Sequence, residues 1–380
     1  MLRINYSLKS DSRQPITDVP MPAELNMRIR NLVLKTGKGK QVECGEIIAE
    51  HPSQSGGASH AAASGRTQVV NYHHLTIQCD GEGRSVSPVD VASMGPGKQL
   101  LRTLQRLGID VTPLGRASLL VVNGLNPEPG ISVAGYLLEN EREVLKVGLK
   151  LAKKLIVPVR TVLAAPSSSC FLTGTETMKV KPKYPASLNV LTVKAVTGKE
   201  YPENTQVMSL MDLYELGRVA LTGLPLTSTI MTIKGHNYRV PIGTPIRHLL
   251  GIMDIPVSNG DTVILGGPFR GEAVYCLDEG VSKRSYGLFV ISRGEFPPIE
   301  DATCINCGEC VLNCPGRIQP NLISRYAEFE MFEMAEKHGL HSCLECGLCS
   351  FNCTARRPLL QYIRLAKEQL LSSGRTPTQA

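Results

Sequence analysis

Eight of the twelve cysteines lie in two short blocks near the C-terminal end of the sequence, and their spacing suggests a specific chemistry. Residues 304–314 read C-x2-C-x2-C-x3-C, and the same spacing returns over residues 343–353. Thiolate sulfur binds iron well, and this spacing is the bacterial pattern for 4Fe-4S ligation. The two blocks therefore predict two 4Fe-4S clusters, which carry electrons.

The assignment of cysteines to clusters follows from a rule for two-cluster ferredoxins, in which the fourth cysteine of each block binds the other cluster. The first set is then Cys304, Cys307, Cys310 and Cys353, and the second is Cys343, Cys346, Cys349 and Cys314. Such an exchange would bring the clusters close enough for electron transfer between them. The alternative is structural zinc, which prefers paired CxxC units separated by a longer loop.

Helices are expected to position the two blocks. Apolar residues at helical spacing over 322–335, including Phe329 and Met331, predict one helix between the blocks that Gly339 ends. A second helix should run from Pro358 to Gly374. Its apolar stripe is Leu359, Ile363, Ala366 and Leu370.

The rest of the 380 residues predicts a multidomain α+β protein, because one core rarely organises so long a chain. Residues 1–85 alternate short apolar runs with Gly and Ser, which suits a small β domain. Residues 86–225 mix helical spacing at 98–107 and 139–155 with buried strands at 117–122 and 160–164, as in an α/β layer with a parallel sheet.

Residues 226–296 return to β structure. The predicted elements are a hairpin over 228–240, a short helix at 244–253 and a strand at 262–265. Phe296-Pro297-Pro298 then forms a linker, because two prolines disfavour both helix and sheet. The helical cluster domain should follow over 297–380.

Composition excludes several classes of function. The first 15 residues lack the apolar core of a secretory signal, and no run approaches the roughly 20 apolar residues that cross a bilayer. The net charge of +7 is spread along the chain, so we expect no nucleic-acid partner. Clustered cysteines in a long chain without a signal sequence fit a reducing cytoplasm.

Several shorter motifs occur in the order of a known family. They lie at residues 38–49 with 59–65, 121–129, 239–246, 266–271 and 280–288. The chain resembles the C subunit of Rnf-type ion-translocating electron-transfer complexes (RnfC), which is related to the flavin subunit of respiratory complex I. The resemblance implies four domains.

These implied domains are an N-terminal β barrel-sandwich domain (1–85), a Rossmann-like α/β layer (86–225), a β-grasp domain of the soluble-ligand-binding type, SLBB (226–296), and a helical two-cluster ferredoxin domain (297–380).

The sequence departs from the family at its flavin and nicotinamide site. The family has a Gly-rich loop, "GMGGAxFP", whose amides approach a phosphate, but residues 93–98 here read SMGPGK. Pro96 removes an amide donor and Lys98 replaces a small residue. Gly95, Gly97 and Glu128 are what remains of an FMN/NADH site, so we expect flavin chemistry to be lost.

The resemblance therefore implies an electron-transfer subunit of a membrane-associated Rnf-like oxidoreductase, without catalytic residues of its own. Its partners would be membrane-embedded Rnf-like subunits and a soluble ferredoxin or cytochrome, and it would lie peripherally on the cytoplasmic face of the plasma membrane. The alternative is an FMN-containing NAD(P)H-oxidising reductase, within Rnf or like the related cobalamin reductases of bacterial microcompartments, with Gly95, Gly97, Lys98 and Glu128 lining its site.

Overall fold

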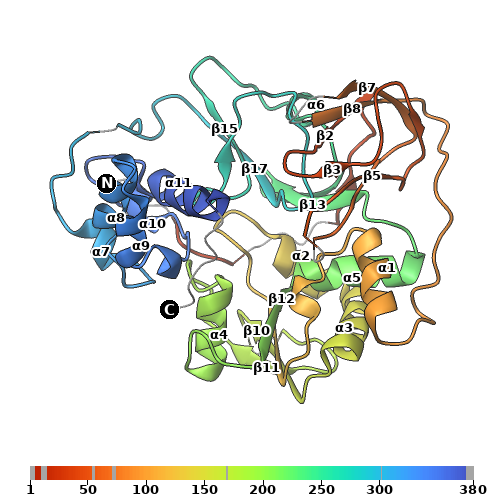
Figure 1. The fold of residues 1–380 in the computed structure, drawn as a ribbon, viewed down its shortest axis with the longest axis horizontal. Helices are drawn as coiled ribbons and strands as arrows, with labels where there is room; N and C mark the ends of the chain where they lie inside the picture. Colours follow the sequence, from red (N-terminus) through yellow and green to blue (C-terminus); the bar gives the residue numbers. More distant parts are fainter. Residues whose placement is uncertain are drawn as a thin grey trace.

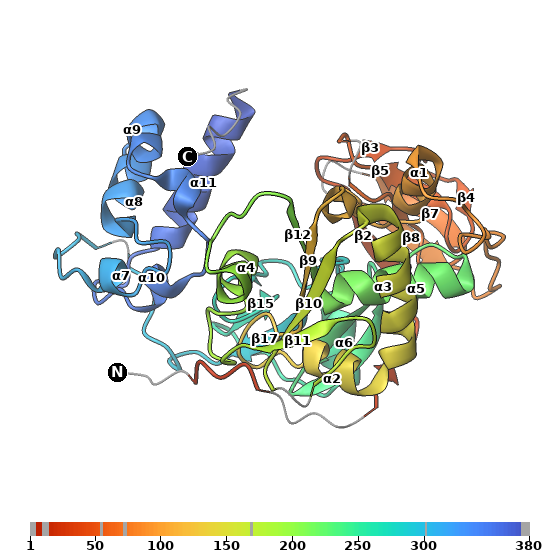
Figure 2. The ribbon, with the colours of Figure 1, turned by 90° about the horizontal axis from the view of Figure 1, so that it is seen from below.

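A computed structural model of the protein describes residues 5–9, 15–53, 56–70, 74–167, 170–300 and 302–373. Within these ranges the chain combines four β-sheets with mostly short helices, so the predicted mixed α+β class is confirmed. Figures 1 and 2 show the sheets gathered in one body, while helices α7 to α11 form a lobe at one end, which we call the cluster lobe.

Strands β2 to β8 form two antiparallel sheets with the orders β2-β8-β7-β4 and β3-β5-β6. Side chains alternate along β2, so Leu25 and Met27 pack against Leu75 and Ile77 of β8. This agrees with the short strands predicted there. The strands are β2 (Glu24–Arg28), β3 (Val33–Leu34), β4 (Gln41–Val42), β5 (Ile47–Glu50), β6 (Ser59–His60), β7 (Gly65–Val70) and β8 (His74–Cys79).

The predicted α/β layer is present, and all its strand pairs are parallel in the order β11-β10-β9-β12. Its strands are β9 (Leu119–Asn123), β10 (Arg160–Ala165), β11 (Glu176–Lys179) and β12 (Thr205–Ser209). Its helices are α1 (Lys98–Arg106), η1 (Thr112–Leu114), α2 (Val133–Asn140), α3 (Arg142–Ile156), α4 (Asn189–Thr197) and α5 (Leu210–Thr222). Since β9 and β12 are parallel and in register, Asn123 and Ser209 lie side by side at their carboxyl ends.

A third unit is a six-stranded sheet of order β1-β14-β13-β17-β15-β16. The predicted hairpin is its β13–β14 pair, and the predicted helix and strand are α6 and β15. The N-terminal segment also belongs here, because β1 pairs with β14. The elements are β1 (Thr17–Asp18), β13 (Ser228–Ile233), β14 (His236–Pro241), α6 (Ile246–Ile252), β15 (Thr262–Leu265), β16 (Glu272–Ala273) and β17 (Gly287–Ile291).

The cluster lobe is helical, but the single helix predicted between the cysteine blocks is wrong. Two helices, α8 and α9, meet at Glu330, whose φ of 55° breaks the helix, and Phe329 is 67% exposed rather than buried. Met331, also predicted in the core, is exposed. The lobe contains α7 (Glu309–Leu312), α8 (Pro320–Glu328), α9 (Phe332–Lys337), η2 (Leu340–Ser342), α10 (Leu348–Phe351) and α11 (Leu359–Ser372).

The predicted apolar stripe of α11 is confirmed. Ile363, Ala366 and Leu370 pack with Ile323 of α8 and Ala335 of α9. Gly374, predicted to end this helix, lies outside the described residues. The domain boundaries at 85, 225 and 296 stay predictions.

Helices α3 and α5 cross with backbone contact at two glycines. A Cβ at Gly148 would lie 1.9 Å from the Leu213 oxygen, and a Cβ at Gly217 would lie 2.1 Å from the Val144 oxygen. Only glycine permits this approach, because no side chain can be displaced to make room. The crossing fixes α5, and with it the residues at the start of that helix.

We expect Gly217→Ala to destabilise the protein by at least about 2 kcal/mol, because overpacking against backbone forces the helices apart. The measurement is the thermal unfolding midpoint of anaerobically prepared protein. Gly251→Ala in α6 is the matched control: no heavy atom lies within 4 Å of its added Cβ, so stability should stay level or rise slightly. Equal midpoints for the two variants would contradict the packing argument.

Candidate iron-sulfur centre and adjoining cleft

The two cysteine blocks have the same backbone form, 39 residues apart along the chain. In each, the second residue after the first cysteine and the glycine after the second cysteine have left-handed φ angles: Asn306 (54°) and Gly308 (81°), then Glu345 (51°) and Gly347 (76°). A short helix follows each glycine, α7 in one block and α10 in the other. These turns curl each loop around a small cavity.

The cavities are lined by crossed sets of cysteines. Cys353 from the second block joins three cysteines of the first, and Cys314 from the first block joins three of the second. The first cavity is lined by Cys304, Cys307, Cys310 and Cys353, and the second by Cys314, Cys343, Cys346 and Cys349. The structure thus brings together the same sets that the ferredoxin rule predicts.

The electrostatics of the thiols follow the same grouping. Burial raises the pKa of Cys310, and negative charge at Cys304, Cys353 and Cys307 raises it further. Burial likewise raises the pKa of Cys346 to about 11, and the neighbouring Cys343 and Cys314 add to the rise. Four thiolates gathered at one site repel one another, so a positive centre such as iron would stabilise each set.

Hydrogen-bond donors already point at several of the sulfurs. The amide of Glu345 donates to Cys343 Sγ at 3.4 Å, and the amide of Arg357 donates to Cys353 Sγ at 3.4 Å. The hydroxyl of Thr354 lies 3.2 Å from Cys307 Sγ and, with the Glu309 amide, lowers the pKa of that thiol. Such donors to sulfur tune the reduction potential of an iron-sulfur cluster.

The two cavities differ in solvent access. Cys307 of the first set is exposed, whereas Cys346 and Cys349 of the second set are buried. The second set also adjoins a larger cleft, because Cys343 lines both. The first cavity is therefore the outer one and the second is the inner one.

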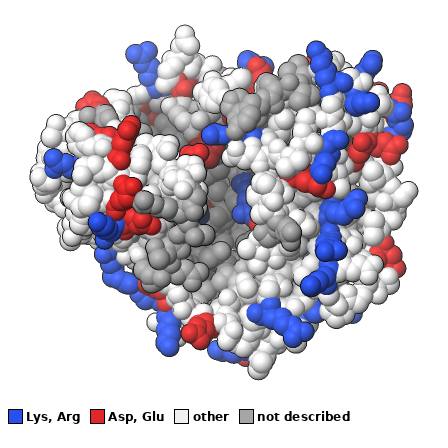
Figure 3. Space-filling view, in the orientation of Figure 1, with Lys and Arg blue, Asp and Glu red and all other residues white. Residues whose placement is uncertain are grey.

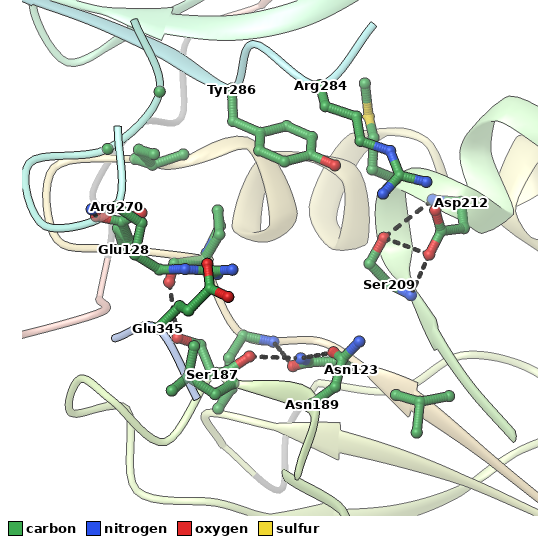
Figure 4. Close-up of a pocket in the computed structure, with 18 of the residues that line it drawn as sticks. Asn123, Glu128, Ser187, Asn189, Ser209, Asp212, Arg270, Arg284, Tyr286 and Glu345 are labelled. Atoms are coloured by element: carbon green, nitrogen blue, oxygen red, sulfur yellow. Dashed lines mark hydrogen bonds between the residues drawn. The ribbon is translucent and has the colours of Figure 1, made fainter. Parts of the chain in front are cut away.

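The larger cleft has a volume of about 1060 Å³ and lies between the α/β layer, the loop after β15 and the cluster lobe. Figure 3 shows a hollow between this lobe and the rest of the molecule. In Figure 4, Asn123, Ser187 and Asn189 group on one side, and Ser209 with Asp212 on another. Asn123 and Ser209 end the parallel strands β9 and β12, and ligand sites commonly form at the carboxyl ends of such strands.

Several polar groups that line this cleft form hydrogen bonds within the protein. Asn123 Nδ2 donates to the Ser187 oxygen at 2.8 Å and to Asn189 Oδ1 at 3.1 Å. Glu128 Oε2 accepts the amides of Phe269 at 2.7 Å and Arg270 at 3.1 Å. Burial raises the pKa of Glu128, while these amides and Arg270 favour its charged form.

The N-terminus of α5 is the place in this cleft where a nucleotide phosphate could bind. A helix N-terminus binds anions, but here Ser209 and Asp212 form a capping box in which Asp212 Oδ2 accepts the Ser209 amide at 2.7 Å. A carboxylate in that position opposes a phosphate. The capping box thus occupies the backbone amides of Ser209 and Asp212, which an anion would otherwise meet at this end of the cleft.

The residues predicted for an FMN/NADH site are not brought together. Glu128 lines the cleft, but Gly95, Gly97 and Lys98 are not among its lining residues. All three are exposed around the start of α1, where an added Cβ at Gly95 or Gly97 would meet nothing within 4 Å. Glu128 instead orders the loop that carries Phe269.

Sequence reasoning missed the aromatic residues that attach the cluster lobe. Phe269 stacks on Tyr184 at a centroid distance of 4.8 Å and meets Phe351 edge-on at 5.3 Å. The Tyr184 hydroxyl donates to the Cys346 oxygen at 2.6 Å. Their separation in the sequence leaves no periodic signal, although Phe269 lies in the motif at 266–271.

Comparison with known proteins supports iron-sulfur clusters in this part of the chain. Residues 297–354 match the family model described as "4Fe-4S dicluster domain". In the residues that the structure describes, no group of three or more His, Cys, Asp or Glu side chains is arranged to hold a single metal ion.

Relatives cover most of the chain. It is 27% identical over 416 residues to the C subunit of the ion-translocating oxidoreductase complex of Pectobacterium carotovorum, covering 94% of this chain and 55% of the relative. It is 24% identical over 429 residues to the C subunit of the proton-translocating ferredoxin:NAD(+) oxidoreductase complex of Clostridium ljungdahlii, covering 97% of this chain and 93% of that one. The chain is thus similar to the C subunits of Rnf-type ion-translocating complexes.

The length of these RnfC relatives varies, and the chain spans between 40% and 65% of the length of several of them. Among solved structures, a chain of the NAD+-reducing [NiFe]-hydrogenase in its H2-reduced state is 13% identical, with a TM-score of 0.44, over 70% of this chain and 62% of that chain. No described helix of this chain is long and apolar enough to cross a membrane.

Replacing either fourth cysteine should damage the cluster of the opposite block. We expect Cys353→Ala to lower the iron content by up to about four atoms per chain and to perturb the outer cluster, which Cys304, Cys307 and Cys310 would hold. Cys314→Ala should perturb the inner cluster instead.

EPR spectra of the two variants after dithionite reduction distinguish the clusters. Cys304→Ala and Cys343→Ala are the matched controls: the spectrum of Cys353→Ala should resemble that of Cys304→Ala, and the spectrum of Cys314→Ala that of Cys343→Ala. The reverse pairing would show uncrossed ligation.

Proposed function

We propose that this protein is the electron-transferring C subunit of a membrane-associated, Rnf-like ion-translocating oxidoreductase. It would pass electrons through two 4Fe-4S clusters and perform no complete reaction alone. The observation that carries the proposal is the pair of adjoining cavities, each lined by four cysteines from both blocks. The match to the dicluster family and the relatives that are C subunits of such complexes support the same function.

The ligands of the outer cluster would be Cys304, Cys307, Cys310 and Cys353, and those of the inner cluster Cys343, Cys346, Cys349 and Cys314. Bound clusters supply one-electron redox chemistry, and the chain supplies position and environment. The short helices α7 and α10 that follow the two loops contact each other, which supports close spacing of the clusters. Electrons would pass between the cleft side and the outer surface.

The α/β layer, the small β sheets and the six-stranded sheet would then serve as a scaffold. We propose that they correspond to the Rossmann-like, barrel-sandwich and SLBB domains of the family. The capping-box carboxylate at the start of α5 and the absence of Gly95 and Gly97 from the cleft lining favour a chain without its own flavin chemistry. Partners would be membrane-embedded Rnf-like subunits, with the chain peripheral on the cytoplasmic face of the membrane.

Protein purified under strictly anaerobic conditions tests this function. We expect about eight iron and eight sulfide per chain, no stoichiometric FMN, and reversible one-electron reduction in the 4Fe-4S range. Bound FMN together with rapid bleaching of the clusters by NADH would favour the reductase alternative. In that case Glu128→Ala should abolish NADH oxidation.

A redox partner, such as a soluble ferredoxin, would reach the outer cluster through its exposed ligand Cys307. Two apolar side chains of the same block are exposed, Ile305 at 66% and Leu312 at 80%. Among the described residues that line the outer cavity, the one charged side chain is Arg357, which is buried. Transient redox interfaces are small, and the core of an interface is apolar and depleted in charged residues.

We expect Leu312→Glu to slow electron exchange with reduced ferredoxin about tenfold in stopped-flow measurements, because docking would then bury a charge. Val159→Glu is the matched control, since Val159 is 91% exposed just before β10, in the α/β layer. Iron content should not change in either variant. Equal rates for the two variants would place the contact elsewhere.

A further inference from the structure

The two cysteine cavities correspond position by position, so their lining residues can be compared one by one. Each residue lining the inner cavity has an outer counterpart 39 positions away, and the two cavities differ in polarity at three places. Where the inner cavity has Ile318, Pro315 and Leu360, the outer cavity has Arg357, Thr354 and Asn321. The same backbone thus encloses an apolar environment at one site and a polar one at the other.

Arg357 makes the largest of these differences. Its side chain is 3% exposed, and its guanidinium pairs with Glu328 Oε2 at 2.5 Å and donates to the Ala302 oxygen at 2.5 Å. Its backbone amide also donates to Cys353 Sγ. These contacts hold a buried positive charge against the outer cluster site, whereas the counterpart Ile318 offers only hydrocarbon.

Reduction of a 4Fe-4S cluster adds one negative charge to it. A nearby cation, hydrogen-bond donors and access to water stabilise that charge and raise the potential, and apolar burial has the opposite effect. Arg357, Thr354 and the exposure of Cys307 all act at the outer site. At the inner site two of the four cysteines, Cys346 and Cys349, are buried, whereas at the outer site only Cys310 is.

We propose that the outer cluster has the higher reduction potential of the two and that Arg357 is a positioning residue that raises it. Electrons arriving at the inner cluster would then collect on the outer one. This inference rests on the proposed function, because it requires both clusters to be present.

Cations near the inner cluster would raise its reduction potential and so reduce the difference between the two clusters. Lys367 Nζ donates to the Cys343 oxygen at 2.9 Å and pairs with Glu345 at 2.8 Å, and Arg364 pairs with Glu345 at 3.2 Å. Neither Lys367 nor Arg364 lines the inner cavity, whereas Arg357 lines the outer one. The charge of Lys367 does act on the Cys343 thiol. Arg357 lines its cavity directly, and Thr354 and the solvent access of Cys307 act in the same sense, so we assign the larger stabilisation to the outer site.

The test is an anaerobic redox titration of the full chain, followed by EPR, in which two one-electron waves should appear. Repulsion between neighbouring reduced clusters also separates such waves, so variants decide the assignment. Arg357→Gln should shift the midpoint potential of the upper wave down by at least 59 mV, which is a tenfold decrease in the reduction equilibrium constant. Lys367→Gln should lower only the other wave and thereby identifies the inner cluster.

Glu328→Gln provides a variant of opposite sign. Removing this carboxylate leaves the Arg357 charge less compensated, so the upper wave should rise. A purely structural role would not move the same wave down in one variant and up in the other. If Arg357→Gln loses its clusters, the wave raised by Glu328→Gln and the wave lowered by Lys367→Gln still decide the assignment.

The proposal is overturned if the lower wave responds to Arg357→Gln or Glu328→Gln, or if neither wave moves while iron content stays at wild-type level. A wild-type protein without two clusters would instead overturn the proposed function, and iron and sulfide analysis separates the two failures.

Discussion

The position of the inner cysteine loop depends on one short turn, residues 266–271, and on the aromatic ring at its centre. Phe269 lies between Tyr184 of the α/β layer and Phe351 of the cluster lobe. The turn is itself fixed, because Glu128 accepts the amides of Phe269 and Arg270. Any movement of the turn would displace the loop that carries Cys346.

Two glycines allow this arrangement. A Cβ at Gly267 would lie 2.2 Å from the Glu128 carboxylate carbon, and a Cβ at Gly347 would lie 2.2 Å from the Phe269 oxygen. Both approaches are closer than any other residue permits. Glu128, which the family resemblance links to a nucleotide site, therefore acts here as a structural anchor for the cluster lobe, and the chain can keep this carboxylate without flavin chemistry.

Local sequence patterns predicted many of the helices and strands. Features that depend on contacts between distant segments could not be predicted from the sequence. The hairpin at 228–240 and the parallel strands around 117–122 and 160–164 carry strong periodic or turn signals, and the structure contains them. The helix over 322–335 was predicted wrongly, because spacing cannot reveal the left-handed Glu330 that divides it. The stacking of Tyr184, Phe269 and Phe351 joins distant segments and could not be predicted from any window of sequence.

For the cluster sites, the sequence predicted the ligands but not the environment of each cluster. The repeated spacing, together with the ferredoxin rule for the fourth cysteine, predicted the crossed sets, because ligation depends on four sulfurs and both blocks contain them. The environment of each cluster depends instead on residues outside that repeat pattern, such as Arg357 and Ile318, whose roles become comparable only once the crossing is known. Cysteine spacing would therefore determine where electrons reside, while the diverged lining residues would determine how strongly each site holds them.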